Sequence, residues 1–467
     1  MAVIDRFSVA ACAFAVASVI GLAAPAIAAP PVAPPKPRQP ATSTAVSSPK
    51  VPVVQPHFAV VAATIHTLQP GAPPLADGVL VVQAGRIACL GVRTVAAGAN
   101  HPLQQKVCAI AAGVPVHEVN GGVLVPGLIE ALGRLGQVEV EAEDATHDGV
   151  AGKESNAAHV QAIDGVQMQS RVMEATRRGG VTTVLARPMG NGLVVGQGVA
   201  FRTIGEVVDD ALVRNPVSIH VNIGEEAKSG EPLVGARSGQ VALLRVLLER
   251  AKRIADADMG KKPKDPAEKE SLQRLRDDPG LTALARVFSE RLPLVAHTHR
   301  ADDIAALLRL QEASGPPGKP ALALVIAGGA EAHVVADRLA AAKVPVILGP
   351  VRERPYAFST KRSTQEAAAL LHAAGVTLAL ATADTFNARH LRWEAGYAVA
   401  GGLPWQAALA GVTRNVAQIF GLGAGVGELV EGQVADFAVY SGDPLAMDGR
   451  VVFVAVAGLP DAAPVQR

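Results

Sequence analysis

The fold of this chain is decided by one stretch, Val123-Leu-Val-Pro-Gly-Leu-Ile-Glu-Ala-Leu-Gly-Arg-Leu-Gly136. Its apolar beginning is typical of a buried β-strand, and we expect that strand to stop at Pro126-Gly127 and to open into a loop. Upstream of it, short apolar runs separated by Gly and Pro turns predict further strands at residues 58–66, 78–91 and 114–119. The stretch therefore stands at the boundary between a small β-rich part and the rest of the chain.

Downstream of this stretch, apolar runs alternate with amphipathic segments of helical length. The alternation predicts a parallel β/α array, and eight strands within roughly 300 residues favour a closed TIM-type (β/α)8 barrel over an open sheet. We therefore predict an α/β fold with a barrel over residues 126–422. Besides the opening strand, the expected strands are 180–186, a weaker one near 199–203, 217–224, 293–297, 321–326, 344–349 and 376–382, and the expected helices include 160–178, 240–257, 301–314, 331–342 and 364–374.

Two strand-like segments follow the barrel, at residues 427–444 and 451–458. We expect them to complete a small β-sandwich domain, whose N-terminal part is 57–125 and whose C-terminal part is 423–467. The charged span 252–278 is expected to be a solvated helical excursion and not a binding patch.

The N-terminus, residues 1–28, is typical of a signal peptide. Arg6 precedes an apolar run, and Ala26-Ile27-Ala28 forms a small-x-small cleavage site. The alternative is a permanent anchor, because the apolar run is just long enough to span a bilayer. Residues 29–56 are rich in Pro, Ala, Ser and Thr, which predicts an extended linker. We therefore expect a periplasmic or secreted protein with no stable membrane insertion after the signal is removed.

Two cysteines, Cys89 and Cys108, remain after removal of the signal. In an oxidising compartment this pair predicts a disulfide, for which closing a loop of roughly 20 residues contributes about 3 kcal/mol. The alternative is two separate buried thiols.

The composition points to a small-molecule ligand. A formal net charge of +1 offers no basic surface for nucleic acid, and 3% aromatic residues make a surface for stacking bases or sugars improbable.

Three predicted strand ends carry candidate groups, which is where a barrel of this kind places its chemistry. One of them, residues 325–331, offers only Glu331 near a helix start and no ligand at the strand tip. His297 and His299 are two residues apart, so they face the same side of a strand and could bind zinc, although a structural pair is an equal alternative. Asp384 is the first charge after a long apolar strand. A carboxylate there can bind a metal, accept a proton from water, or cap the following helix.

These segments resemble the amidohydrolase superfamily. The Pro-Gly-Leu-Ile of the opening stretch is similar to the lead-in of that family's first barrel strand, which continues with an acidic residue and His-x-His. His297-Thr-His-Arg-Ala-Asp-Asp-Ile304 resembles the fifth-strand motif of imidazolonepropionase-related members, and Thr382-Ala-Asp384-Thr resembles the eighth-strand aspartate. The similarity extends from about residue 58 to residue 458. It implies that His297 and Asp384 bind one divalent metal such as zinc, and that Asp384 is the base that activates water.

The metal site is degenerate by the same comparison. The first-strand histidines correspond to Leu132 and Arg134, and the sixth-strand histidine corresponds to Gly328. Leucine offers no donor atom and a guanidinium repels a cation, so three protein ligands are missing. A zinc site needs at least three good ligands, and a tightly held metal is therefore not expected in the usual place.

Two functions remain in competition. The first is an exported hydrolase acting on an amide or cyclic amide C–N bond, with metal-activated water, Asp384 as base, and His299 and Arg134 contacting the substrate. The second is an inactive pseudo-amidohydrolase that serves as a binding protein or as the partner of a second copy or of a catalytic homologue. In that case Arg134 would form a salt bridge with Asp384 and replace the charge of the metal. A third interpretation has Arg134 pointing to solvent.

Overall fold

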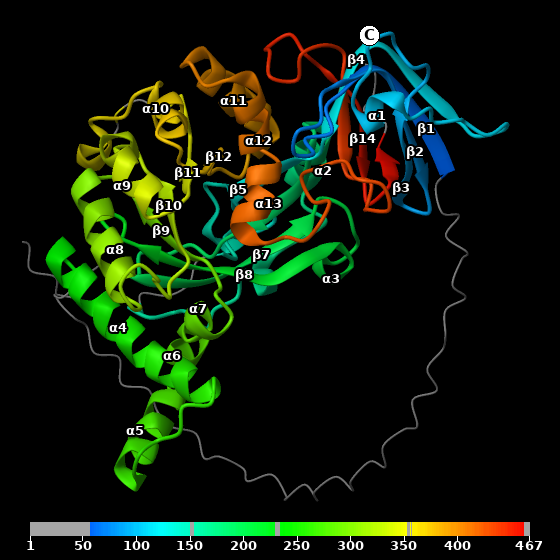
Figure 1. Ribbon diagram of the computed structural model, residues 1–467. Helices are drawn as coiled ribbons and strands as arrows, with labels where there is room; N and C mark the ends of the chain where they lie inside the picture. The colour runs from blue at the N-terminus through cyan, green and yellow to red at the C-terminus, as the bar shows by residue number, and fades with distance from the viewer. Residues whose placement is uncertain (1–56, 150–153, 229–233, 353–354, 356, 462–467) are drawn as a thin grey trace, which may run out of the picture. The chain divides into compact units, whose positions relative to one another are not determined.

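The computed structural model describes residues 57–149, 154–228, 234–352, 355 and 357–461 (Figure 1). The expected signal peptide and linker, residues 1–28 and 29–56, lie outside the described residues. Within the described part, every helix is too short or too polar to cross a bilayer.

The barrel is an eight-stranded sheet in the order β12-β11-β10-β9-β8-β7-β6-β5. Its first and last strands also contact each other, so the barrel is nearly closed. This confirms the predicted fold class, an α/β barrel with a separate sheet. The strands are β5 (Leu128–Gly133), β6 (Val181–Ala186), β7 (Val194–Arg202), β8 (Leu212–Asn222), β9 (Leu294–Thr298), β10 (Leu324–Gly328), β11 (Val346–Leu348) and β12 (Leu378–Leu380).

One barrel strand departs from the parallel arrangement that we expected. β7 runs antiparallel to both β6 and β8, whereas the other neighbouring pairs are parallel. The reason lies in the connections. A parallel pair needs a crossover of a dozen or more residues, but only residues 187–193 link β6 to β7, and no helix lies between them. The weak apolar run near 199–203 is the end of this antiparallel strand.

Side-chain alternation separates the inside of the barrel from its outside. On β9, Val295 lies in the inner cluster with Ala327 and Ala379, while Leu294 and Ala296 belong to the outer cluster that the helices cover. His297 follows Val295 at the same period and therefore also faces inward. The interior is filled by small and branched side chains up to the strand ends, which leaves the polar residues at the mouth.

Helices cover the outer side of the barrel, as Figure 1 shows for α4, α8 and α9 beside β8 to β10. The charged span 252–278 includes the end of α4 and all of α5, most of whose residues are exposed. The expected helix 160–178 is α-helical only at its end, in α2, and has one short 3-10 helix at Ala162–Gly165. The helices are α1 (Pro102–Gln105), α2 (Arg171–Arg178), α3 (Val208–Ala211), α4 (Arg237–Asp258), α5 (Pro266–Arg276), α6 (Pro279–Leu284), α7 (Arg286–Ser289), α8 (Ala301–Ala313), α9 (Ala336–Ala341), α10 (Ala367–Ala373), α11 (Leu391–Ala400), α12 (Trp405–Gly411) and α13 (Arg414–Phe420).

A buried carboxylate joins the first and last barrel strands. The described structure has no strand-pairing ladder between β12 and β5. Instead Glu130, whose exposed fraction is 0%, accepts hydrogen bonds from the Thr382 backbone N–H at 2.9 Å and from its hydroxyl at 2.7 Å. It also accepts one from the Leu132 N–H at 3.0 Å. One side chain thus supplies polar contacts where backbone pairing is missing.

The opening stretch belongs to two sheets and not to one strand followed by a loop. The strand that ends at Pro126 is β4 (Val116–Pro126) of the separate sheet, and β5 of the barrel begins at Leu128. Gly127 is the single residue between them. A Cβ at this position would collide with the side chain of Thr182, so the close passage of the chain requires glycine.

The separate sheet is built from both ends of the described chain, in the order β15-β14-β13-β4-β1-β2-β3. Apolar clusters cover both of its faces, and Phe58, Phe437 and Phe453 contact one another in the larger cluster. Besides β4, its strands are β1 (His57–Ile65), β2 (Leu75–Gln83), β3 (Arg86–Val92), β13 (Phe437–Tyr440), β14 (Val451–Val456) and β15 (Leu459–Asp461).

Cys89 on β3 and Cys108 form a disulfide with an S–S distance of 2.01 Å. The bond ties β3 to the segment that follows α1. Cys108 is buried in the smaller apolar cluster of the sheet.

Candidate functional site

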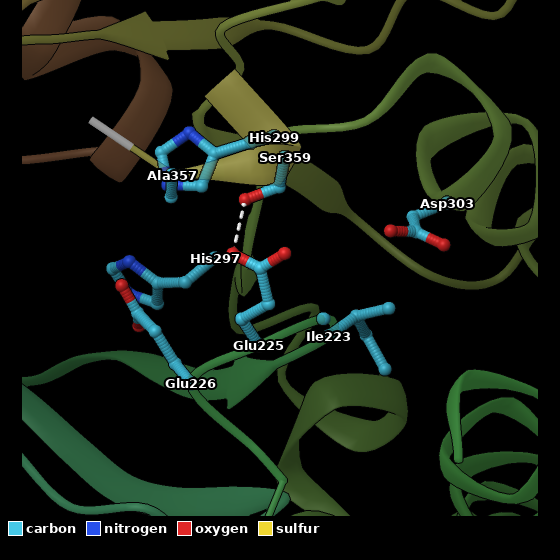
Figure 2. A pocket seen from close by; sticks show the side chains of 9 residues that line it. Ile223, Glu225, Glu226, His297, His299, Asp303, Ala357 and Ser359 are labelled. Atoms are coloured by element: carbon cyan, nitrogen blue, oxygen red, sulfur yellow. Dashed lines mark hydrogen bonds between the residues drawn. The ribbon is translucent and has the colours of Figure 1, made fainter. Parts of the chain in front are cut away.

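A cavity of about 260 Å³ lies at the carboxyl ends of β8 and β9 (Figure 2). This is the end of the barrel at which active sites of this fold occur. Imidazole and carboxylate side chains supply most of its polar lining. The lining residues are Ile223, Gly224, Glu225, Glu226, His297, His299, Asp303, Ala357 and Ser359.

One wall of the cavity is an ordered chain of ionic contacts. Arg237 donates from Nε to Asp303 at 2.9 Å, and its Nη2 lies 3.5 Å from Glu225. Ser359 donates its hydroxyl to the other oxygen of Glu225 at 2.8 Å, the contact drawn in Figure 2. Glu226 is exposed and forms no ion pair among the described residues. It is therefore the carboxylate of this cavity that remains free to contact a ligand.

The second wall contains a buried histidine pair. His297 Nε2 lies 2.9 Å from His220 Nδ1, and His220 Nε2 lies 2.8 Å from the hydroxyl of Ser218. Because a neutral imidazole has one donor and one acceptor nitrogen, these contacts form a chain with one proton per bond. His297 Nε2 is consequently occupied by a protein partner.

His299 fills the space above Gly328. An ideal Cβ at Gly328 would lie 2.7 Å from His299 Cε1, and Gly328 has a φ of +83°. Position 328 corresponds to the sixth-strand histidine of the resembled family, so the ring of His299 occupies the volume into which that side chain would extend. His299 Nδ1 is buried and has no hydrogen-bond partner among the residues that the structure describes.

Burial lowers the pKa of all three imidazoles at this site. The pKa of His220 and that of His297 lie well below the usual value, because desolvation is reinforced by the charge of Arg187. Burial also lowers the pKa of His299, against the opposing influence of Glu226 and Glu225. At neutral pH the rings are therefore uncharged.

Asp384 lies after β12, and its carboxylate is hydrogen-bonded to a residue close by in the sequence. One carboxylate oxygen accepts from the Asn387 backbone N–H at 2.9 Å, and the other lies 3.2 Å from the Asn387 side-chain nitrogen. Asp384 does not line the cavity that contains His297 and His299. The structure therefore places the predicted His297 and His299 in the lining of one cavity, which Asp384 does not line.

Arg134 follows β5 and is partly buried, with 24% of its side chain exposed, so it does not simply point to solvent. It donates to Met189 Sδ at 3.2 Å and lies 3.8 Å from Glu141. Among the described residues it forms no salt bridge with Asp384, the pair on which the inactive interpretation relied.

The donor set does not fit a metal. Among the described residues, the one group of three His, Cys, Asp or Glu side chains with mutually close donor atoms is Cys89, Cys108 and Glu431, and its two sulfurs are already bonded to each other. By the resemblance described above, Leu132, Arg134 and Gly328 are predicted to stand where the family has metal ligands. We therefore assign no step of the chemistry to a metal.

Several buried polar atoms near the mouth of the barrel have no hydrogen-bond partner among the described residues. An unsatisfied buried polar group costs about 1–3 kcal/mol, and a charged one more, so their gathering at one end indicates a region built to contact something else. These atoms include Arg134 Nε, Arg187 Nε, Asn222 Oδ1, Thr298 Oγ1 and His299 Nδ1.

Sequence reasoning missed four groups at this end of the barrel. Glu225 and Glu226 stand directly after the predicted strand 217–224, and His220 alternates inward within it, so strand ends and period 2 could have found all three. Arg187 gave no such signal, because a single arginine after an apolar run is usually solvated.

Comparison with known proteins agrees with this architecture. Residues 296–463 match the model of the amidohydrolase family. The chain is 26% identical over 376 residues to "Amidohydrolase tasK" of Hapsidospora irregularis, an alignment that includes 73% of this chain and 36% of that protein. The chain thus spans about a third of the length of that relative.

Solved structures show the same fold. An amidohydrolase from Thermotoga maritima MSB8 superposes with a TM-score of 0.72 and 24% identity, covering 86% of this chain and 99% of that one. A putative prolidase from Bifidobacterium longum gives a TM-score of 0.50 with 18% identity, covering 88% and 95%.

The barrel with its strand-end cavity is thus the fold of a solved amidohydrolase. Residues 296–463 are similar to the amidohydrolase family, and the longer alignment is to a protein named as an amidohydrolase. The imidazolonepropionase-related subgroup stays a prediction.

Proposed function

We propose that this protein is an exported hydrolase that cleaves an amide or cyclic amide C–N bond of a small molecule in the cavity of His299 and Glu226. The observation that carries the proposal is the uncharged imidazole of His299, which lines a cavity at the reactive end of the barrel and whose buried Nδ1 has no hydrogen-bond partner among the described residues. The choice of a C–N bond follows from the relationship to amidohydrolases.

Each residue of the cavity has a separate role in the proposed reaction. The uncharged His299 can accept a proton from a water molecule as that water attacks the carbonyl carbon, and can return it to the leaving nitrogen. The exposed carboxylate of Glu226 stabilises the imidazolium formed in between, because it raises the proton affinity of His299. The chain Asp303, Arg237 and Glu225 holds the opposite wall in place.

Replacement of His299 tests this assignment. His299→Ala is expected to lower kcat roughly 100-fold or more on a panel of amides and cyclic amides, since general base catalysis contributes about 10²–10⁴-fold. Asp384→Asn is the matched comparison, because Asp384 is the base that the family resemblance implies. We expect Asp384→Asn to retain most activity, with a folded structure by circular dichroism.

The converse result would assign the chemistry differently. Loss of activity in Asp384→Asn but not in His299→Ala, together with a stoichiometric divalent metal in elemental analysis of protein purified without chelator, would favour the metal-activated mechanism with Asp384 as base.

The competing function is a catalytically inactive binding protein or partner subunit. Leu132, Arg134 and Gly328 at three former ligand positions favour it. It would be supported if the wild-type chain bound amides without turning over any of the panel, alone or together with a catalytic homologue.

Export is tested separately. The disulfide between Cys89 and Cys108 is the type of bond that persists in oxidising compartments and supports this part of the proposal. We expect the mature protein to be found in the periplasm or medium, to begin after Ala28, and to have no free thiol at Cys89 or Cys108. Intact mass and thiol titration measure this, and a cytoplasmic chain that retains residues 1–28 would contradict it.

A further inference from the structure

Two arginines leave the barrel side by side. Gly133 and Ala186 are the last paired residues of the parallel strands β5 and β6, and Arg134 and Arg187 follow them directly. The Arg187 backbone N–H also donates to the Gly133 carbonyl at 3.2 Å. Neighbouring strands lie about 4.8 Å apart, so residues in register past their ends emerge next to each other at the mouth.

Among the described residues, neither guanidinium has a carboxylate partner at a short distance. Arg134 has only the long 3.8 Å contact with the mostly exposed Glu141, and Arg187 forms no salt bridge within the described part of the chain. In the described part of the chain, Nε of both side chains is buried and has no hydrogen-bond partner. An arginine does not lose its proton in a protein, so two fixed cations with unsatisfied donors follow neighbouring strand ends.

The two charges are coupled to each other and to the cavity. Burial lowers the pKa of Arg187, the charge of Glu226 opposes this shift, and the charge of Arg134 adds to it. The charge of Arg187 in turn adds to the effect of burial in lowering the pKa of His297. The arginine pair is therefore within electrostatic reach of groups that line the cavity.

We propose that Arg134 and Arg187 form an oxyanion site that binds a carboxylate or phosphate group of the ligand. Two planar forks of N–H donors match the oxygen atoms of such a group, and the anion relieves the repulsion between them. This proposal makes the proposed function more specific, and it depends on that function only for the reaction. The substrate would be an acid whose scissile C–N bond reaches His299 while its anionic end lies between the arginines.

A structural alternative makes a different prediction. If the arginines only replace the charge of a former metal, their substitution changes stability and leaves ligand affinity unchanged. If they form a binding site, substitution weakens the binding of acids specifically. Binding and stability must therefore be measured on the same variants.

The test uses calorimetric titration of the full chain with three probes. N-acetylglycine carries an amide and a carboxylate, N-acetylglycinamide is its uncharged counterpart, and inorganic phosphate represents the other source of oxyanion. We expect the wild type to bind at least one of the two anions, and to bind the uncharged amide more weakly than N-acetylglycine if the carboxylate is the preferred group.

Arg134→Gln and Arg187→Gln are expected to weaken anion binding roughly ten- to a hundredfold each, with little change for the uncharged probe. Arg300→Gln is the matched control, because Arg300 lies at the same end after β9 but pairs with Asp302 at 3.1 Å, and it should leave anion affinity unchanged. Lysine variants at 134 and 187 retain the charge, and should bind with intermediate affinity if a glutamine variant fails to fold.

Two results would overturn the site: neither anion binds the wild type, or the glutamine and lysine variants bind anions as the wild type does. His299→Ala separates the site from the proposed reaction. Retained anion binding without turnover supports the oxyanion site whatever the fate of the hydrolase proposal, and turnover that is indifferent to both arginines supports the hydrolase alone.

Discussion

Raising the pH from about 4.5 to about 7 is expected to lower the free energy of unfolding by about 3 kcal/mol through Glu130 alone. Burial raises the pKa of this carboxyl group to about 7, against its hydrogen bonds with Thr382 and Leu132. These donors and the Ala383 backbone N–H favour the ionised form, but they do not offset the loss of hydration of a completely buried charge.

The sign follows from proton linkage. Between pH 4.5 and pH 7 the folded protein keeps a proton on Glu130 that the unfolded chain has already released. The folded state therefore binds more protons in this interval, and stability decreases as the pH rises. The full stabilising contribution of Glu130 is present below the pKa of the unfolded chain, and it is lost as the pH rises through the pKa of the folded protein.

Glu130→Gln isolates this contribution. Glutamine has nearly the same shape as glutamic acid and no charge. The unfolding free energy of the wild type, measured relative to that of the variant, should therefore fall as the pH rises across the interval. Urea denaturation followed at several pH values measures this difference. A difference that is constant with pH would show that Glu130 has an ordinary pKa in the folded protein.

Gly328→His is expected to destabilise the protein by about 4 kcal/mol. The substitution restores the residue that the family carries at this strand end, yet it meets two obstacles. A side chain at φ +83° is strained by about 1–2 kcal/mol, and its Cβ would lie 2.7 Å from the ring of His299. The second obstacle disappears in the double variant with His299→Ala, which should recover roughly half of the loss.

Gly375→His provides the matched control. Gly375 has a φ of +84°, and no heavy atom lies within 4 Å of the Cβ it would carry, so only the backbone cost applies. Its loss should be about 1–2 kcal/mol and should not respond to His299→Ala. If Gly328→His cost no more than this control, or if His299→Ala recovered nothing, His299 would not occupy the missing side chain's space.

The fold could be predicted from the sequence because its signals are local. The apolar period of β9 and the small residues of β12 are visible in a single stretch of chain, and their order is sufficient for a barrel. The antiparallel course of β7 was not foreseen, because the direction of β7 depends on whether segment 187–193 is long enough to return the chain to the other end of the sheet. The division at Gly127 was missed because one apolar run serves two sheets.

The site was only partly predictable for the same physical reason. His297 and His299 share a strand, so alternation places them together. The relation of Asp384 to them depends on how a side chain turns after its strand ends, and there Asn387 offers a nearer partner. Glu130 and Thr382 are 252 residues apart in sequence, and nothing local reveals their contact.

The position of β13 has a consequence for folding during synthesis. This strand lies between β4 and β14, so an edge of β4 is covered only by residues synthesised more than 300 positions later. Until residue 440 has left the ribosome, that edge stays open to other chains, a condition that favours aggregation. Completion of the sheet must therefore wait until β13 has been synthesised.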